Sequence, residues 1–235
     1  MTRWGGLDGC RGGWALATLD DGGGLDVRVV ARFDEALALV VGEHLATLAV
    51  DMPIGLPDDG RRAADRDARA RLGARRSTVF PTPCRAALHA TAYDEALALS
   101  RATTGVGLSV QAFHLLPRMR EVDRGMRPEL QDRVAECHPE LAFAALAGTP
   151  LPTSKHTPEG IAARVTLLDG ALGALGGEAS PAASAVGQPP RGARADDVAD
   201  AIAIALVARR LEQGDVERLG DGARDQRGLR MEIVI

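Results

Sequence analysis

The first fifty residues alternate apolar runs with tight turns, in an order that few folds can accommodate. Three apolar runs separated by glycine-rich turns cover residues 3–8, 14–19 and 25–33. Their spacing predicts a meander of three antiparallel strands. A helical pattern begins at Asp34, which we expect to cap it, and continues to about Ala46, before a short apolar strand at Thr47–Asp51. Because a helix provides the crossover that a parallel strand needs, the fourth strand is expected beside the first and parallel to it.

This order predicts an α/β protein with a ribonuclease H-like mixed sheet, in which three antiparallel strands are joined by parallel strands and flanked by helices. We expect a single domain over residues 1–235 with a helical insertion at about 58–130. The 173–195 segment is rich in Gly, Ala, Ser and Pro, which is typical of a mobile loop. The other predicted elements are a fifth strand at 131–137, a helix after Pro158, a long helix at 195–211 and an edge strand at 229–235.

Composition limits the kinds of protein that this chain can be. With 235 residues, of which 46% are hydrophobic, it can bury a core without disulfides or structural metals. A net charge of −4 and 3% aromatic residues provide neither the positive field nor the stacking surface of a non-specific nucleic-acid binder. Three cysteines without a C-x-x-C pair favour a reducing, cytoplasmic compartment. No apolar run is long enough to predict a membrane span.

Two aspartates end apolar strands. Asp8 follows the first strand and Asp51 the fourth, and each precedes a glycine or proline turn. Alone, each aspartate is more typical of a turn. If the two strands are parallel neighbours, however, both carboxylates lie at the carboxyl end of the sheet, where α/β proteins place their chemistry.

The last long helix carries further carboxylates in line with its apolar face. Asp197, Asp200, Ile204 and Val207 follow a three-four spacing and therefore form one seam. A carboxylate on a buried seam is costly unless a cation pairs with it. Asp196 lies one turn before Asp200 and is a candidate for the same cluster. The structural alternative is that Asp196 caps the helix and Asp197 complements its dipole.

These carboxylates predict a metal site. Two cations about 3.5–4 Å apart need several shared anionic oxygens, which is the arrangement of two-metal phosphoryl-transfer enzymes. Glu136, at the end of the predicted fifth strand, is a candidate for a further ligand. Ligands that are all oxygen fit Mg²⁺ or Mn²⁺ better than zinc. The candidate metal ligands are Asp8, Asp51, Glu136, Asp196, Asp197 and Asp200.

Four motifs in this order resemble a known family. They are GLDGCRGGW (6–14), VDMPIGLP (50–57), ECHPE (136–140) and DDVADA (196–201). Together they resemble domain-of-unknown-function family 429, described as predicted nucleases of ribonuclease H fold, over about residues 3–210. The Asp197-x-x-Asp200 pair also looks like the last helix of Holliday-junction resolvases. The resemblance implies the fold and a metal site.

An arginine-rich segment is a candidate phosphate contact. Residues 61–76 contain seven arginines and two aspartates, and Arg62, Arg66 and Arg69 share one face of a helix. Planar guanidinium groups suit phosphate recognition. A solvated helix in an arginine-rich chain is the structural alternative.

Two further cationic residues are candidate substrate contacts. Lys155 is the only lysine, and it is expected to place a compact ammonium group near phosphate or the carboxylates. Arg11 lies in the glycine turn after Asp8 and is expected to approach a bound phosphate.

The leading prediction is a metal-dependent phosphodiester hydrolase, or nuclease, acting on nucleic acid or a nucleotide. Its catalytic residues would be Asp8, Asp51, Asp197 and Asp200. The first alternative is an ATP-dependent phosphotransferase of the sugar-kinase and actin-like superfamily, because the glycines at 9, 12 and 13 resemble a phosphate loop. The second is a catalytically silent binding module with the same fold.

Overall fold

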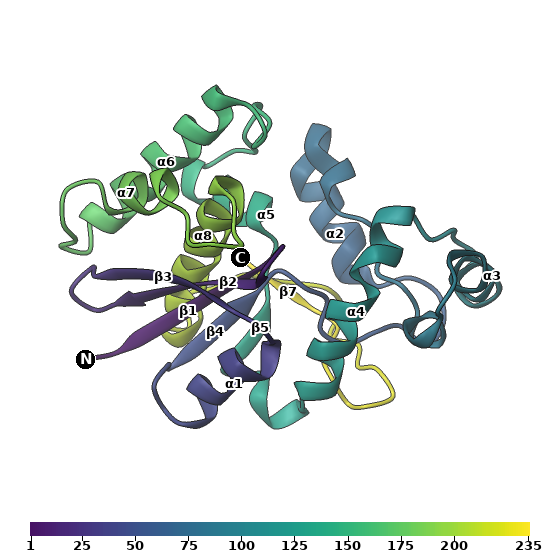
Figure 1. Cartoon of the computed structure of the whole chain (residues 1–235). Helices are drawn as coiled ribbons and strands as arrows, with labels where there is room; N and C mark the ends of the chain where they lie inside the picture. The colour runs from purple at the N-terminus through teal and green to yellow at the C-terminus, as the bar shows by residue number, and fades with distance from the viewer.

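A five-stranded mixed sheet lies at the centre of the computed structural model, which describes residues 1–235 (Figure 1). Its strands are β1 Arg3–Cys10, β2 Gly13–Asp20, β3 Leu25–Val30, β4 Thr47–Val50 and β5 Val134–Glu136. They stand in the order β3-β2-β1-β4-β5. β2 is antiparallel to both β1 and β3, whereas β4 is parallel to β1 and β5. The predicted α/β mixed sheet is thus confirmed.

Helices surround the sheet. The α-helices are α1 Phe33–Val41, α2 Ala63–Leu72, α3 Tyr93–Thr104, α4 Val110–Gly125, α5 Pro139–Ala147, α6 Pro158–Gly173, α7 Pro181–Gly187 and α8 Ala195–Glu212. Short 3-10 helices are η1 Gly73–Thr78, η2 Arg85–His89 and η3 Pro128–Leu130. Between β4 and β5 the regular structure is entirely helical, from α2 to η3. No helix has the length and apolar character needed to cross a membrane.

Several element boundaries differ from the prediction. β1 continues past Asp8 to Cys10, because Gly9 and Cys10 still pair with the start of β2. Arg32, rather than Asp34, is the residue before the first turn of α1, and Asp34 lies within that turn. The predicted mobile loop contains α7, which buries Ala182 and Val186 in the core.

The end of the chain also forms less strand than predicted. Only β7 Ile233–Val234 is extended, and it pairs with β6 Arg218–Leu219 in a separate two-stranded sheet. The residues before β7 instead bond back to an adjacent turn, as when the Met231 amide donates to the Ala223 carbonyl.

The two faces of the sheet bury side chains of different size. On one face, α5 to α8 cover small residues such as Ala17 and Ala49. On the other face, α1 and α4 pack against larger residues such as Leu16 and Leu48. The small side chains allow α8 to lie very close to β1, and this contact fixes where the helix presents its own residues.

Gly6 is the point of closest approach between β1 and α8. A Cβ atom at this position would lie 2.1 Å from the Ala201 carbonyl oxygen and 2.4 Å from the Ala205 amide nitrogen. Because backbone must shift to relieve such a clash, we expect Gly6→Ala to lower the free energy of unfolding by about 3 kcal/mol. Urea denaturation measures this loss. The matched control is Gly170→Ala in α6, where the added methyl meets nothing and should be neutral or slightly stabilising.

Candidate active site

The carboxyl ends of β1 and β4 hold Asp8 and Asp51 side by side. Leu7 pairs with Val50 in the parallel ladder, and the Asp51 amide donates to the Leu7 carbonyl at 2.9 Å. The two aspartates therefore stand at the same level, and the charge of Asp51 acts on the carboxyl group of Asp8 to raise its pKa. The predicted juxtaposition of these two residues is present.

A third carboxylate reaches the same place from α8. Asp200 is almost fully buried, at 1% exposure, and its Oδ2 atom accepts a hydrogen bond from the Lys155 ammonium at 2.5 Å. Its other oxygen, Oδ1, is buried and has no hydrogen-bond partner. Lys155 lies between α5 and α6, so four separate segments meet at this point.

The two aspartates at the start of α8 have different surroundings. Asp197 Oδ2 accepts a hydrogen bond from the Arg194 amide at 2.8 Å, which caps the first turn of the helix. Asp196 lies 3.5 Å from the imidazole Nδ1 atom of His156. The capping role that we considered for Asp196 thus belongs to Asp197.

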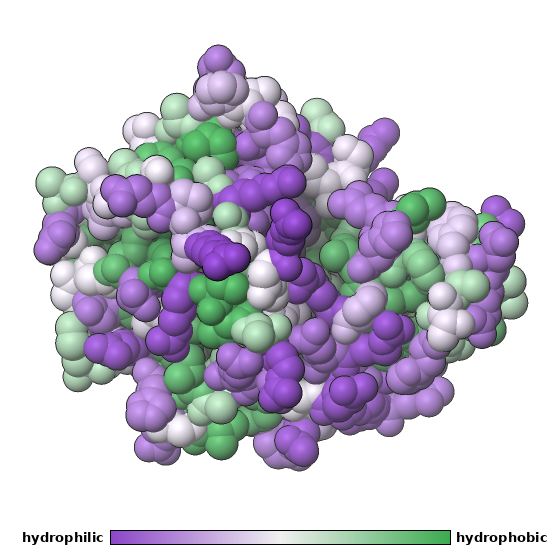
Figure 2. Space-filling model, in the orientation of Figure 1, coloured by the Kyte–Doolittle hydropathy of each residue, from purple (hydrophilic) through white to green (hydrophobic).

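A cleft of about 490 Å³ opens in front of the carboxylates. Asp8, Asp51, Asp197 and Asp200 line it from the sheet and α8, whereas Asp196 and Arg11 do not. The opposite wall comes from the helical segment between β4 and β5, including η1 and α4. Figure 2 shows hydrophilic side chains gathered around the hollow between these two parts of the molecule.

The electrostatics of the cluster follow from burial. Burial raises the pKa of Asp8 well above its ordinary value, and the neighbouring charges of Asp51 and Asp200 raise it further. Burial also raises the pKa of Asp200, to about 6, against the lowering by Lys155. Burial alone would lower the pKa of Lys155, but the charges of Asp200 and Asp8 outweigh it and raise this pKa. The cluster therefore resists full ionisation, because a single ammonium group balances several carboxylates.

Comparison with known proteins identifies the family. Residues 6–225, nearly the whole chain, match the model of a family described as "Protein of unknown function (DUF429)". The chain belongs to this family. No curated protein and no solved structure matched. The matched range contains all of the clustered carboxylates and Lys155, so the site lies within the part of the chain that defines membership of DUF429.

Glu136, which we predicted as a metal ligand, is committed to other partners. Its Oε2 atom accepts from the Ile54 amide and from Arg62 Nη2, both at 2.7 Å. Burial raises the pKa of Glu136 to about 7, against the lowering by Arg62. Glu136 lines the cleft, but its carboxylate serves mainly to join β5 to the loop after β4 and to the start of α2.

The arginines predicted to contact phosphate do not form one exposed face. Arg62 precedes α2 and is buried between Glu136 and Asp65. Arg69 donates to the carbonyl groups of Arg76 and Val79, whereas Arg66 is exposed beside Asp67. None of the three arginines lines the cleft.

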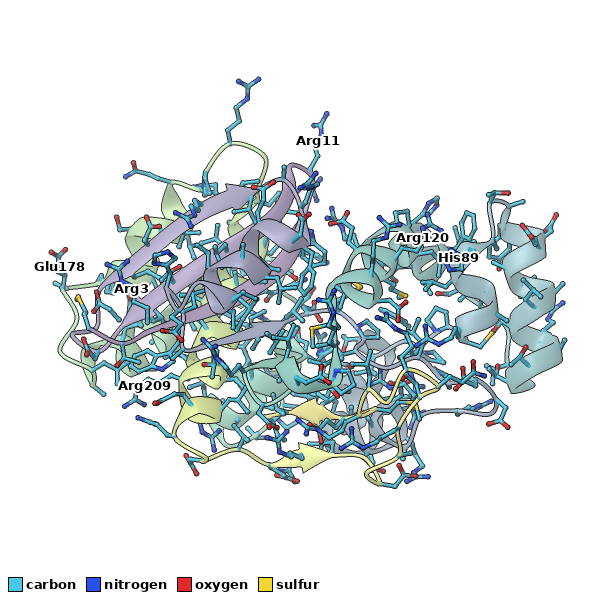
Figure 3. All side chains as sticks on the ribbon, turned by 90° about the horizontal axis from the view of Figure 1, so that it is seen from below. Arg3, Arg11, His89, Arg120, Glu178 and Arg209 are labelled. Carbon is cyan, nitrogen blue, oxygen red and sulfur yellow. The ribbon has the colours of Figure 1, made fainter.

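The β1–β2 hairpin is fixed in place by a residue that sequence reasoning missed. Arg118 of α4 donates to the carbonyl groups of Cys10 and Gly13, and its guanidinium lies 5.2 Å from the centre of the Trp14 ring. The Gly12 amide donates to the Gly192 carbonyl at 2.9 Å, so it is not free for a phosphate. Arg11 projects from the hairpin, away from the cleft (Figure 3).

Glu140, which lines the cleft, has two arginine partners that the sequence did not predict. Glu140 accepts a hydrogen bond from the buried Arg164 at 2.7 Å and also lies 3.3 Å from Arg75. In the sequence, Arg164 is 24 positions from Glu140, and Arg75 is 65 positions from it. The chain has twenty-seven arginines, and nothing in the sequence shows which of them pairs with Glu140. The sequence does indicate that Pro139 and Glu140 begin a helix.

A divalent cation suits the chemistry of this donor set. Asp8, Asp51 and Asp200 provide only oxygen atoms, as Mg²⁺ and Mn²⁺ prefer. The buried Oδ1 atom of Asp200 has no hydrogen-bond donor, so it is available as a ligand. In the present arrangement no three His, Cys, Asp or Glu side chains lie close enough to hold an ion together. The Lys155 ammonium instead neutralises part of the cluster.

Proposed function

We propose that this protein is a metal-dependent phosphodiester hydrolase with a ribonuclease H-like fold. The observation that carries the proposal is the meeting of Asp8, Asp51 and Asp200, from three separate elements, at the cleft end of the sheet. Keeping three carboxylates together, of which Asp8 and Asp200 are buried and Asp51 is half-buried, costs free energy that a purely structural role does not require. Such costly clusters are typical of functional sites.

Each residue of the cluster has a role in this proposal. Asp8, Asp51 and Asp200 would hold Mg²⁺ or Mn²⁺, which supplies an activated water and stabilises the leaving oxygen. Asp197 stands at the rim of the cleft, where its hydrogen bond to the Arg194 amide keeps it in place. The burial of Asp8 and Asp200 keeps bulk water away from these two carboxylates, so that their charges act with little screening.

Calorimetric titration of the purified protein with Mn²⁺, together with hydrolysis of bis(4-nitrophenyl) phosphate, tests the proposal. We expect Mn²⁺ to bind and the release of nitrophenolate to depend on it. Absence of both binding and hydrolysis would rule the proposal out. Calcium, which is larger and accepts irregular coordination, provides a comparison ion for the binding measurement.

Lys155 competes with a divalent cation for the same carboxylates in this proposal. Because its ammonium is bonded to the Oδ2 atom of Asp200 at 2.5 Å, a cation on the unpartnered Oδ1 atom of the same carboxylate would be repelled by this positive charge. We expect Lys155→Met to raise the affinity for Mn²⁺ about tenfold, which corresponds to about 1.4 kcal/mol. The calorimetric titration measures this. Lys155→Arg, which keeps the charge, should show no such gain, and weaker Mn²⁺ binding by Lys155→Met would contradict the competition.

A further inference from the structure

The cleft has a size and a charge that restrict its substrate. We propose that it takes a nucleotide-sized phosphoester, with one or two phosphate charges and a heterocyclic base, in preference to a polynucleotide. The inference rests on the proposed hydrolase function and narrows its substrate class.

Most arginines of the 61–76 segment, the candidate phosphate contact, already bond to other groups of the protein. Five of the seven arginines at 61–76 bond to a carboxylate or a carbonyl of the protein itself: Arg62, Arg66, Arg69, Arg71 and Arg75. Only Arg61 and Arg76 have no such partner. Binding along a nucleic-acid backbone requires cations for several consecutive phosphates, and this segment does not provide them.

The charge inside the cleft also disfavours a long anion. Seven carboxylate side chains line it, against two residues with permanent positive charge, Arg75 and Lys155. Both cations are bonded to carboxylates, Arg75 to Glu140 and Lys155 to Asp200. A single phosphate would be compensated by metal ions held by the aspartates, whereas further phosphates of a polynucleotide would find no unpaired arginine or lysine in the cleft.

The volume and the far wall fit one nucleotide. About 490 Å³ lies within the range of clefts that bind small organic ligands. The wall opposite the aspartates includes Val79, Phe80 and Leu115, of which Phe80 is half-buried. An aromatic ring in this position offers a stacking surface for a base, and the exposed Gln111 amide offers both a donor and an acceptor for its edge.

The test compares three substrates in Mn²⁺: the 4-nitrophenyl ester of thymidine 5′-monophosphate, a 30-nucleotide single strand and a 30-base-pair duplex. We expect kcat/KM for the nucleotide ester to exceed that per bond of either polymer at least tenfold. Its KM should rise no more than about tenfold between 50 and 200 mM salt, as for one or two phosphate contacts. Methyl 4-nitrophenyl phosphate, which lacks a base, is the reference ester.

Two variants locate the binding surface. Phe80→Ala should raise KM for the nucleotide ester about tenfold, with kcat little changed, and should leave KM for the base-free ester unaltered. A triple variant, Arg61→Gln, Arg66→Gln and Arg76→Gln, removes exposed arginine charge outside the cleft and should leave all rates unchanged. Thermal unfolding of each variant confirms that it is folded.

The possible failures are distinguishable. Faster cleavage of a polymer per bond, with a steep salt dependence that the triple variant weakens, would overturn the substrate inference and leave the hydrolase function intact. Binding of Mn²⁺ without cleavage of any of these esters would also overturn the inference. Absence of Mn²⁺ binding together with absence of cleavage would remove the hydrolase function itself.

Discussion

Replacing Asp8 by Asn should reduce Mn²⁺-dependent phosphodiester hydrolysis by about a thousandfold while the protein stays folded. The substitution keeps the size of the side chain but removes one of the negative charges that face the cleft. A rate about a thousandfold lower corresponds to the loss of several kcal/mol by which the metal would stabilise the transition state. Steady-state rates at saturating Mn²⁺ measure the effect. Asp34→Asn, in the first turn of α1 on the protein surface, is the matched control and should keep the full rate.

The same substitution should make the metal-free protein more stable. Because the pKa of Asp8 is raised in the folded state, the folded protein holds this proton more tightly than the unfolded chain does. Stability from this group is therefore complete below its ordinary pKa of 3.8 and is lost as the pH rises through the raised pKa. Asp200, with a pKa of about 6, acts in the same direction.

Metal-free wild type is accordingly expected to become less stable between about pH 4 and pH 7, and Asp8→Asn should weaken this dependence. Melting temperatures recorded with a chelator at several pH values test it. Saturating Mn²⁺ should protect the wild type much more than the variant. If the wild type and Asp8→Asn had equal melting temperatures at neutral pH without metal, repulsion between the ionised carboxylates would be contradicted.

The second large effect is expected at Arg62. Its side chain is fully buried and pairs with Glu136 at 2.7 Å and with Asp65 at 3.5 Å. Arg62→Leu should lower the free energy of unfolding by about 3–5 kcal/mol, because it leaves a buried carboxylate without its counter-charge. Urea denaturation measures the loss.

Two comparisons separate this effect from a general effect of losing arginine. Arg66→Leu, four residues along and exposed, should change stability by no more than about 0.5 kcal/mol. The double variant Arg62→Leu with Glu136→Gln should recover much of the loss, since the amide oxygen of Gln can still accept from the Ile54 amide. Equal losses at Arg62 and Arg66 would contradict the buried ion pair.

Local patterns were sufficient to predict the sheet and part of the site. The alternating runs before residue 50 indicate the order of the first four strands, and the three-four spacing in α8 places Asp200 on its buried side. Because Asp8 and Asp51 end neighbouring parallel strands, their proximity follows from the topology. These inferences need only the period of each element and the direction of the crossover.

Pairings between distant side chains could not be predicted in the same way. Arg62 and Glu136 are separated by 74 positions, and the predicted helix face of Arg62, Arg66 and Arg69 gave no sign that the first would be buried. Asp197 shares the seam of Asp200, yet it lies in the first turn and bonds to a backbone amide. Which partner a charged side chain finds depends on the packing of whole elements.

The contacts of Arg118 have a consequence for how a substrate enters. This residue belongs to α4, on the far wall of the cleft, yet it holds the carbonyl groups of the hairpin next to Asp8. Together with the Arg62–Glu136 pair it links the two walls of the cleft. These contacts fix the distance between the two walls of the cleft. A substrate wider than this distance would therefore be excluded from the carboxylates.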